Sequence, residues 1–243
     1  MRTENPRGEP VQLTVYAREV DEAEGVAGRI AGLVREGEYG YGDVAVFCRM
    51  TALTRPIEQA LRSARVPYQI VGGVSFYERQ EVKDVLSYLS LLTNPKDDLA
   101  FARVVNVPPR GLGKTSLDHL VRAARERAVP LLAMAAQAHL AEGLKDKAVR
   151  AFQEFARLIA ELAGLGDHSA EEVIRKLLDR TGYRKYLEED SRENGEDRLA
   201  NLDELISAAG EFDHEHPGAA IHDFLADITL ASPVDRWDQQ GRP

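Results

Sequence analysis

The sequence predicts a fold in two parts, an α/β part with a thin parallel sheet and an all-α part. Within the first 95 residues, short apolar runs alternate with amphipathic helical segments, which is the pattern of a parallel sheet covered by helices. Beyond Lys96, apolar positions recur almost only at helical spacing. The change falls beside Asn94-Pro95, where the residue before proline disfavours helix. We therefore place a domain boundary near residue 95.

Three strands are predicted in the first part, at Val11–Tyr16, Val44–Cys48 and Pro67–Val71. The run Val44–Cys48 is continuously apolar, as expected for a strand that is buried on both faces of a parallel sheet. Three strands make a smaller sheet than the usual one of about five or six strands. We therefore expect further strands elsewhere in a longer protein, which is a first indication of a fragment.

Each predicted helix has apolar positions three or four residues apart. In the first part, helices are predicted over residues 19–37, 53–64 and 79–93. In the second part, they are predicted over residues 99–105, 115–128, 131–141, 145–162, 170–181, 198–212 and 219–230.

The best candidate for a phosphate contact is a turn that leads into one of these helices. It consists of Arg110, Gly111, Leu112, Gly113, Lys114 and Thr115. Thr115 and Asp118 have the spacing of a capping box, so a helix is expected to begin near Lys114 or Thr115. Glycines let a partner approach the backbone, and the first N–H groups of a helix attract an anion such as a DNA phosphate. The alternative is an ordinary corner between two helices.

The same turn also ends like a nucleotide-binding P-loop, at Gly113-Lys114-Thr115. Pro108 stands where that motif has its first glycine, and proline has neither the N–H group nor the freedom that the loop needs. We therefore disfavour an independent nucleotide-binding enzyme that uses this turn.

Charge is distributed unevenly along the chain, whose formal net charge is −9. Residues 99–130 contain six Lys and Arg against two Asp and Glu, whereas residues 186–243 contain four against fifteen. A confined basic patch around Arg110 is therefore compatible with an acidic protein. No apolar run approaches the roughly 18 residues that a membrane span needs, and the single cysteine, Cys48, fits a reducing cytoplasm.

Two further places are candidates for a ligand site. Arg49 follows the most apolar predicted strand, at the sheet edge where ligands gather, and an arginine there can bind a phosphate or pair with a nearby acid. His214 and His216, with His222 further along, suggest a metal, but Pro217-Gly218 prevents a helix from aligning them. We read this second segment as a solvated acidic loop.

Several motifs together resemble the UvrD/PcrA/Rep family of superfamily 1 DNA helicases. They are Pro67–Gly73, Phe76–Asp84, Asn94-Pro95, Asp97-Asp98, Asn106–Gly113 and Arg198–Leu205, with Ala200 where that family usually has glutamate. The matches run from about Thr3 to Asp238, nearly the whole chain, and are specific in combination.

This resemblance implies an internal piece of a helicase. Residues 1–95 are expected to be the first part of a RecA-like domain (2A), residues 96–235 an all-helical accessory domain (2B), and residues 236–243 a tail. The implied activity is ATP-dependent 3′-to-5′ unwinding of duplex DNA in repair or replication. The implied partners are duplex and single-stranded DNA, the rest of the helicase chain and repair proteins, without a membrane.

The resemblance also assigns roles to residues. Arg49 aligns with the motif IV arginine that contacts the γ-phosphate of ATP, while Cys48 replaces a tyrosine that stacks on adenine. The turn Arg110–Thr115 aligns with the 2B element that grips the duplex backbone. ATP and Mg²⁺ are expected in the intact enzyme, but no catalytic residue and no metal ligand is assigned here. The chain alone, which has no P-loop lysine and no magnesium carboxylate motif, is expected not to hydrolyse ATP.

The alternative is a non-catalytic module, derived from a helicase, that binds duplex DNA or a protein. Genuine start and stop signals in the gene would favour this alternative, whereas helicase motifs in frame on both sides would indicate an excised fragment.

Overall fold

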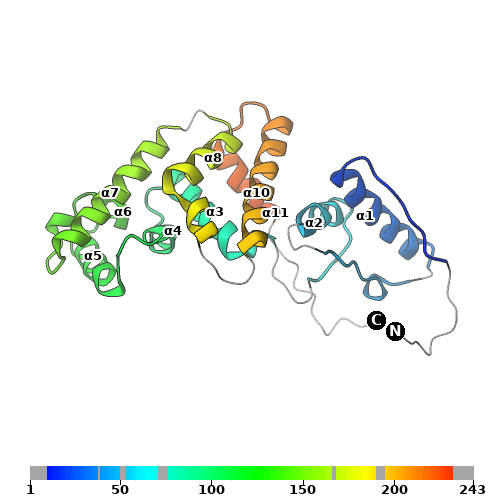
Figure 1. Ribbon diagram of the computed structural model, residues 1–243, viewed down its shortest axis with the longest axis horizontal. Helices are drawn as coiled ribbons and strands as arrows, with labels where there is room; N and C mark the ends of the chain where they lie inside the picture. Colours follow the sequence, from blue (N-terminus) through cyan, green and yellow to red (C-terminus); the bar gives the residue numbers. More distant parts are fainter. Residues whose placement is uncertain are drawn as a thin grey trace. The chain divides into compact units, whose positions relative to one another are not determined.

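A computed structural model describes residues 10–37, 39–49, 53–70, 76–165, 168–189 and 195–231 (Figure 1). Residue contacts divide the chain into two compact units near residue 70. Unit 1 comprises residues 1–49 and 53–69, and unit 2 comprises residues 50–52 and 70–243.

Unit 1 is built around two helices, α1 (Glu19–Arg35) and α2 (Thr54–Ser63), with a 3-10 turn, η1 (Tyr41–Asp43), between them in sequence. The two helices pack against each other through small and branched apolar side chains. The buried members of this core are Ala23, Ala27, Ile30, Ala60, Leu61 and Val66. Three of these residues, Ala23, Ala27 and Ala60, are alanines, so the two helices can approach each other closely.

The predicted parallel sheet is wrong, because no strand occurs among the residues that the structure describes. Val11–Tyr16 and Val44–Cys48 have non-helical backbone without strand pairing, and Val11 and Phe47 are 99% and 93% exposed. Of the third predicted strand, Val71 lies outside the described residues. The physical reason is that a strand bonds to a neighbouring strand, so an apolar run cannot by itself provide the partner that makes it a strand.

Unit 2 is helical throughout its described residues, apart from turns and loops. Its helices are η3 (Phe76–Glu78), α3 (Gln80–Thr93), α4 (Asp98–Val104), α5 (Lys114–Glu126), α6 (Leu131–Ala136), η4 (Ala138–Leu140), α7 (Asp146–Ala163), α8 (Ala170–Thr181), α9 (Tyr183–Glu189), α10 (Gly195–Glu215) and α11 (Ile221–Ala231). Within this unit, α5, α6 and α7 gather at one end, and α3 lies among α8, α10 and α11 (Figure 1).

The core of unit 2 is continuous from α3 to α11. Aromatic rings occupy its middle, where Phe155 of α7 meets Phe101 of α4 at 5.5 Å and Tyr88 of α3 at 6.2 Å between ring centroids. All three side chains are at most 1% exposed. This cluster fixes the position of the loop that follows α4, which carries the Gly-Leu-Gly turn.

Helix positions follow the sequence prediction closely. Predicted helices at 79–93, 145–162 and 170–181 correspond to α3, α7 and α8 within one residue. Helix α9 is absent from the sequence prediction, because Gly182 indicates a break at this point. Gly182 does end α8 with φ +68, and the chain enters α9 at the next residue. The predicted domain boundary at residue 95 stays a prediction.

Candidate nucleic-acid interface

The Gly-Leu-Gly turn is held in shape by Asn106. Its side-chain oxygen accepts hydrogen bonds from the backbone N–H groups of Arg110, at 2.8 Å, and Leu112, at 3.1 Å. Leu112 is 5% exposed and joins the core of unit 2, whereas Gly111 has φ +73, a conformation that favours glycine. The turn is therefore anchored by one buried side chain and exposes the backbone on either side of it.

Arg110 reaches back under this turn. Its Nη1 lies 3.2 Å from the carbonyl oxygens of Val104, Val105 and Pro108, and its Nη2 donates to the Tyr88 hydroxyl at 2.8 Å. The guanidinium also lies over the Phe155 ring, 5.0 Å from its centroid. Arg110 therefore binds the last carbonyls of α4 and the turn together, with its charge half-buried below the surface.

Tyr88 completes this support from α3. Its hydroxyl is bonded to the carbonyl oxygen of Val107, and Val104 provides a second oxygen at 3.3 Å. Burial raises the pKa of the Tyr88 phenol, and the nearby charge of Arg110 acts in the opposite direction. Tyr88 therefore stays a neutral hydroxyl that connects the arginine to the turn.

Helix α5 begins at Lys114, as the sequence predicted. The predicted capping box between Thr115 and Asp118 does not cap it, because the N-cap residue is Gly113 and no side chain bonds to the first turn. Gly113, Lys114 and Thr115 are exposed. The start of α5 thus combines uncapped N–H groups with one exposed lysine.

A second corner of the same conformation lies beside the first. Gly143 has φ +82, Leu144 packs against the core, and Lys145 is the extended N-cap of α7, again without a side-chain cap. In both corners, residues 111–113 and 143–145, a glycine and a leucine precede the N-cap residue of a helix. A Cβ on Gly143 would lie 2.4 Å from the His119 ring of α5, so this glycine lets the two helix starts approach closely.

Lys147 of α7 lies beside the turn, and the sequence analysis did not place it there. A Cβ built on Gly111 would lie 3.5 Å from Cε and 3.7 Å from Nζ of Lys147. The two residues are 36 positions apart, and no periodic signal in the sequence brings them together. The end of the Lys147 side chain therefore lies within ordinary contact distance of residue 111.

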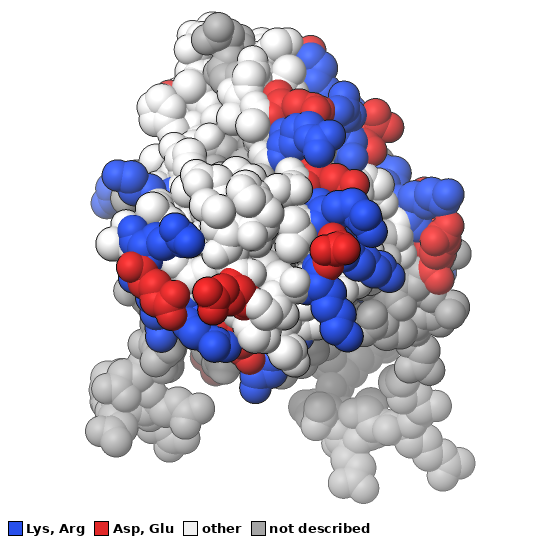
Figure 2. All heavy atoms as spheres, turned by 90° about the vertical axis from the view of Figure 1, so that its left-hand side faces the viewer, with Lys and Arg blue, Asp and Glu red and all other residues white. Residues whose placement is uncertain are grey.

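The cations at this end of unit 2 lack acidic partners. Residues 104–160 carry nine Lys and Arg against five Asp and Glu, namely Arg110, Lys114, Arg122, Arg125, Arg127, Lys145, Lys147, Arg150 and Arg157. For none of the nine is an ion pair found among the described residues. On α8 and α9, by contrast, Arg175, Lys176, Arg184 and Lys185 each pair with a carboxylate. Figure 2 looks onto the end formed by α5, α6 and α7 and shows basic side chains gathered on the right and at the lower left, with acidic ones among them and other residues in the middle.

Arg49, in unit 1, is also exposed and has no ion-pair partner within the described part of the chain. Cys48 before it is partly buried, and burial, with a smaller effect of the Glu22 charge, raises the pKa of its thiol. Residues 50–52 after it lie outside the described residues. An exposed, unpaired guanidinium is compatible with the predicted phosphate contact.

Two of the sequence motifs meet in a buried polar network. Arg79 Nη1 donates to Asn201 Oδ1 at 2.6 Å, and Asn201 Nδ2 donates to Glu81 Oε1 at 2.5 Å. Arg198 Nε lies 3.6 Å from the other oxygen of Glu81. Arg79, Glu81 and Asn201 are at most 5% exposed. The segments 76–84 and 198–205 are therefore direct partners, which fasten the start of α3 to α10.

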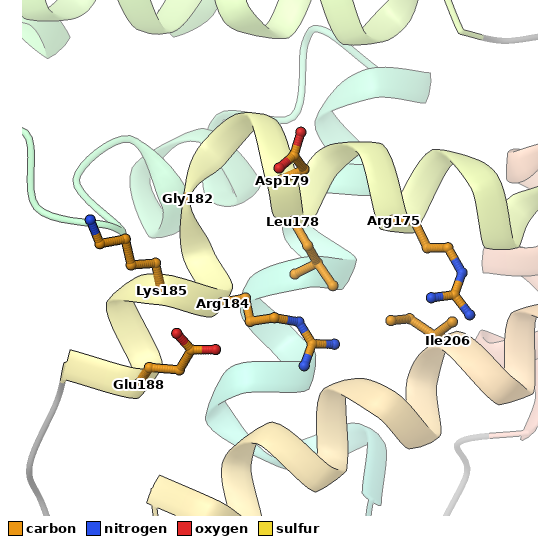
Figure 3. Close-up of a pocket in the computed structure, with 8 residues that line it drawn as sticks. All are labelled: Arg175, Leu178, Asp179, Gly182, Arg184, Lys185, Glu188 and Ile206. Carbon is orange, nitrogen blue, oxygen red and sulfur yellow. The ribbon is translucent and has the colours of Figure 1, made fainter.

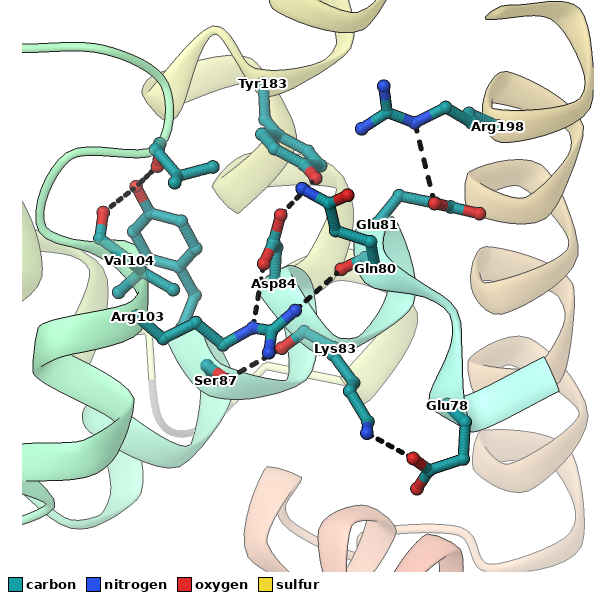
Figure 4. Close-up of polar contacts among 12 residues, drawn as sticks. Glu78, Gln80, Glu81, Lys83, Asp84, Ser87, Arg103, Val104, Tyr183 and Arg198 are labelled. Carbon is teal, nitrogen blue, oxygen red and sulfur yellow. Dashed lines mark hydrogen bonds and ion pairs between the residues drawn. The ribbon is translucent and has the colours of Figure 1, made fainter. Parts of the chain in front are cut away.

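A second part of the network surrounds Asp84 (Figure 4). This carboxylate is buried and accepts from Arg103 Nε of α4 and from the Tyr183 hydroxyl of α9, both at 2.8 Å. Arg103 also donates to the Gln80 carbonyl at 3.2 Å. Burial, and then the negative charge of Asp84, raise the pKa of Tyr183. One carboxylate thus joins three helices.

A family model described as the UvrD-like helicase C-terminal domain matches residues 1–240. The chain belongs to this family. Among its relatives, ATP-dependent DNA helicase PcrA of Bacillus subtilis is 35% identical over 239 residues, which cover 98% of this chain and 32% of the relative. DNA helicase II of Salmonella typhimurium is 37% identical over 245 residues, 97% of this chain and 34% of the relative.

A third relative, ATP-dependent DNA helicase UvrD1 of Mycobacterium tuberculosis strain H37Rv, is 35% identical over 256 residues, 98% of this chain and 33% of the relative. The chain thus spans about a third of the length of the curated relatives it matches. The helical content of the structure fits the UvrD-like helicase C-terminal family.

One hollow of about 450 Å³ lies on unit 2 of this UvrD-like chain (Figure 3). It is lined by Arg175, Leu178, Asp179, Gly182, Arg184, Lys185, Glu188 and Ile206. Its cations are balanced by carboxylates in the lining and by the ion pairs of α8 and α9 described above. We therefore assign no ligand to it.

The histidines of residues 214–222 include two that contact an aromatic ring or a carboxylate in this UvrD-like chain. His216 stacks on Phe212 at 4.6 Å between ring centroids, and His222 lies 3.3 Å from Asp223. In the described ranges, no group of three metal-ligating side chains is found. None of the described helices is long and apolar enough to cross a membrane.

Proposed function

We propose that this chain is part of an ATP-dependent 3′-to-5′ DNA helicase that unwinds duplex DNA. In this proposal, residues 1–95 are the first part of domain 2A, residues 96–235 are the accessory domain 2B, and residues 236–243 are a tail. Membership of the UvrD-like family supports the proposal, as do relatives named ATP-dependent DNA helicases at 35% identity. Duplex and single-stranded DNA, the rest of the helicase chain and repair proteins are the proposed partners.

The single observation that carries the DNA-binding part is the exposed Gly-Leu-Gly turn at the start of α5. Gly111, Gly113, Lys114 and Thr115 present backbone and one ammonium group to solvent, while Asn106 holds the turn from within. Such a surface suits a phosphate, because backbone N–H groups at a helix start and a lysine both bind phosphate oxygens. We propose that it binds the backbone of duplex DNA without sequence preference, with Leu112 as its anchor and Arg110 as its support.

The proposed nucleotide contact is Arg49. Its exposed, unpaired guanidinium fits a phosphate, and we propose that it contacts the γ-phosphate of ATP in the intact enzyme. ATP supplies the phosphate that is cleaved, and Mg²⁺ neutralises its charge. The remaining ligands of both are expected in parts of the helicase beyond these residues.

The chain by itself is expected to show no ATP turnover. It has no P-loop lysine, and the residues assigned here include no magnesium ligand. The measurement is phosphate release by the purified chain with ATP, Mg²⁺ and single-stranded DNA, compared with the same protein boiled beforehand. Turnover that exceeds this background and follows the protein through purification would contradict the expectation.

Replacement of Lys114 by alanine is expected to weaken DNA binding without affecting stability. Lys114 is exposed and forms no ion pair in the described structure, so its loss removes one phosphate contact. The slope of log affinity against log salt concentration should become less steep by about one. The measurement is fluorescence anisotropy of the chain with a duplex that bears a single-stranded tail, at several salt concentrations. Lys185→Ala, on α9, is the matched control, because Lys185 is also exposed but pairs with Glu189.

The outcomes separate the proposals. If Lys114→Ala binds DNA with the affinity and salt dependence of the unsubstituted chain, the turn is not a phosphate site. If the unsubstituted chain binds no DNA even at low salt, a non-catalytic protein-interaction module gains support instead.

A further inference from the structure

We propose that Lys147 is a second phosphate-contacting residue of the duplex site, with its side chain beside Gly111 of the turn that leads to Lys114. This inference rests on the proposed function of the Gly-Leu-Gly turn and extends it to a different helix, α7. It names a residue that neither the P-loop-like pattern nor the helicase motifs of the sequence contain.

The first support is the close approach of Lys147 to the turn. The end of its side chain lies against the position that a side chain of residue 111 would occupy, with Cε at 3.5 Å and Nζ at 3.7 Å. Gly111 itself is exposed, so a partner that touches its backbone meets the ammonium group of Lys147 as well. A lysine is suited to this because its flexible stem carries a compact point charge to a phosphate.

The second support is the charge environment of Lys147. Asp146 and Glu142 are its nearest acidic neighbours in sequence, and neither forms an ion pair with it in the described structure. An exposed lysine without a protein carboxylate keeps its full charge for a ligand. The paired cations of α8 and α9 lack this property.

The third support is that the start of α7 is fixed against α5. The Gly143 backbone packs on the ring of His119, leaving no room for a Cβ, and Arg122 Nη2 lies 3.4 Å from Nδ1 of the same ring. The backbone of Lys147 therefore has a defined position relative to the turn, although its side chain is free to adjust. A cation that is held at a set place on a neighbouring helix can engage a phosphate together with the turn.

Two cations at one turn have a measurable consequence. Duplex DNA carries one charge per about 1.7 Å of its axis, so Lys114 and Lys147 can neutralise different phosphates. Each should then contribute separately to the number of counterions released on binding. Loss of both lysines is expected to make the slope of log affinity against log salt concentration less steep by about two, and loss of either by about one.

The experiment measures DNA affinity of the whole 243-residue chain against salt concentration for Lys147→Ala, Lys114→Ala, the double variant and Lys185→Ala. The probe is a tailed duplex of unrelated sequence, read by anisotropy. We expect Lys147→Ala to weaken binding by about fivefold at low salt, Lys147→Arg to retain it, and Lys185→Ala to leave it unchanged. Thermal unfolding followed by circular dichroism checks that each variant is folded, which its exposed position predicts.

Two results would overturn the inference in distinguishable ways. If Lys114→Ala weakens binding while Lys147→Ala matches the unsubstituted chain, Lys147 is not a contact and the proposed turn site stands. If neither variant changes binding, or the unsubstituted chain does not bind the duplex, the proposed DNA-binding function of the turn fails together with the inference.

Discussion

Replacing Asp84 with alanine is expected to lower the free energy of unfolding by about 3 kcal/mol. The buried carboxylate accepts hydrogen bonds from Arg103 of α4 and Tyr183 of α9, both at 2.8 Å. Its loss leaves the buried Tyr183 hydroxyl without this acceptor and separates α3 from its two neighbours. Chemical unfolding, followed through the loss of the helical signal in far-ultraviolet circular dichroism, measures the change.

Two matched variants show whether the effect comes from the buried carboxylate. Tyr183→Phe removes one donor but leaves the ion pair with Arg103, so a loss of about 1 kcal/mol is expected. Lys83→Ala breaks an exposed ion pair with Glu78 on the same stretch of chain, and its effect should stay below about 0.5 kcal/mol. An Asp84→Ala protein as stable as Lys83→Ala would show that the network does not hold the three helices together.

This network gives a physical account of two motifs that carry the family resemblance. Contacts within unit 2 involve Arg79, Glu81 and Asp84 of the first motif and Asn201 of the second. These contacts are structural in this unit, because they join helices that are far apart in sequence.

The sequence was sufficient for most helices because a helix makes its hydrogen bonds within one segment. The spacing of Val82, Val85 and Leu89, for example, both predicts α3 and places these residues in the core, where all three are fully buried. It was not sufficient for the predicted sheet. Val44–Cys48 is as apolar as a central strand, yet no described segment pairs with it.

The candidate site divides in the same way. The spacing of Thr115 and Asp118 predicted that α5 begins near Lys114, which the structure confirms, although the N-cap is Gly113 and has no side-chain cap. The inward direction of Arg110 and the approach of Lys147 to Gly111 could not be predicted in this way, because both depend on how α3, α4 and α7 pack. Local sequence fixes where a turn lies along the chain, but tertiary packing decides which charges face outward from it.

Replacing Arg110 with alanine is expected to lower the free energy of unfolding by about 2–4 kcal/mol and to weaken DNA binding at the same time. The guanidinium is the shared donor for three carbonyl oxygens and the Tyr88 hydroxyl, and it also covers the Phe155 ring. Without it, these four groups lose this donor and the turn loses its support, even though Lys114 remains. The measurements are chemical unfolding and anisotropy with the tailed duplex on the same protein.

The two readouts together decide how Arg110 acts. Arg110→Lys keeps the charge but replaces a planar fork with a single ammonium group, which cannot reach all four acceptors, so part of the stability loss should persist. Lys114→Ala, by contrast, should weaken binding with stability unchanged. If Arg110→Ala is as stable as the unsubstituted chain and yet loses DNA binding, its guanidinium contacts the phosphate directly and the supporting role inferred from its hydrogen bonds is wrong. If stability and binding fall together and Arg110→Lys is intermediate in both, the arginine acts on DNA through the shape of the turn.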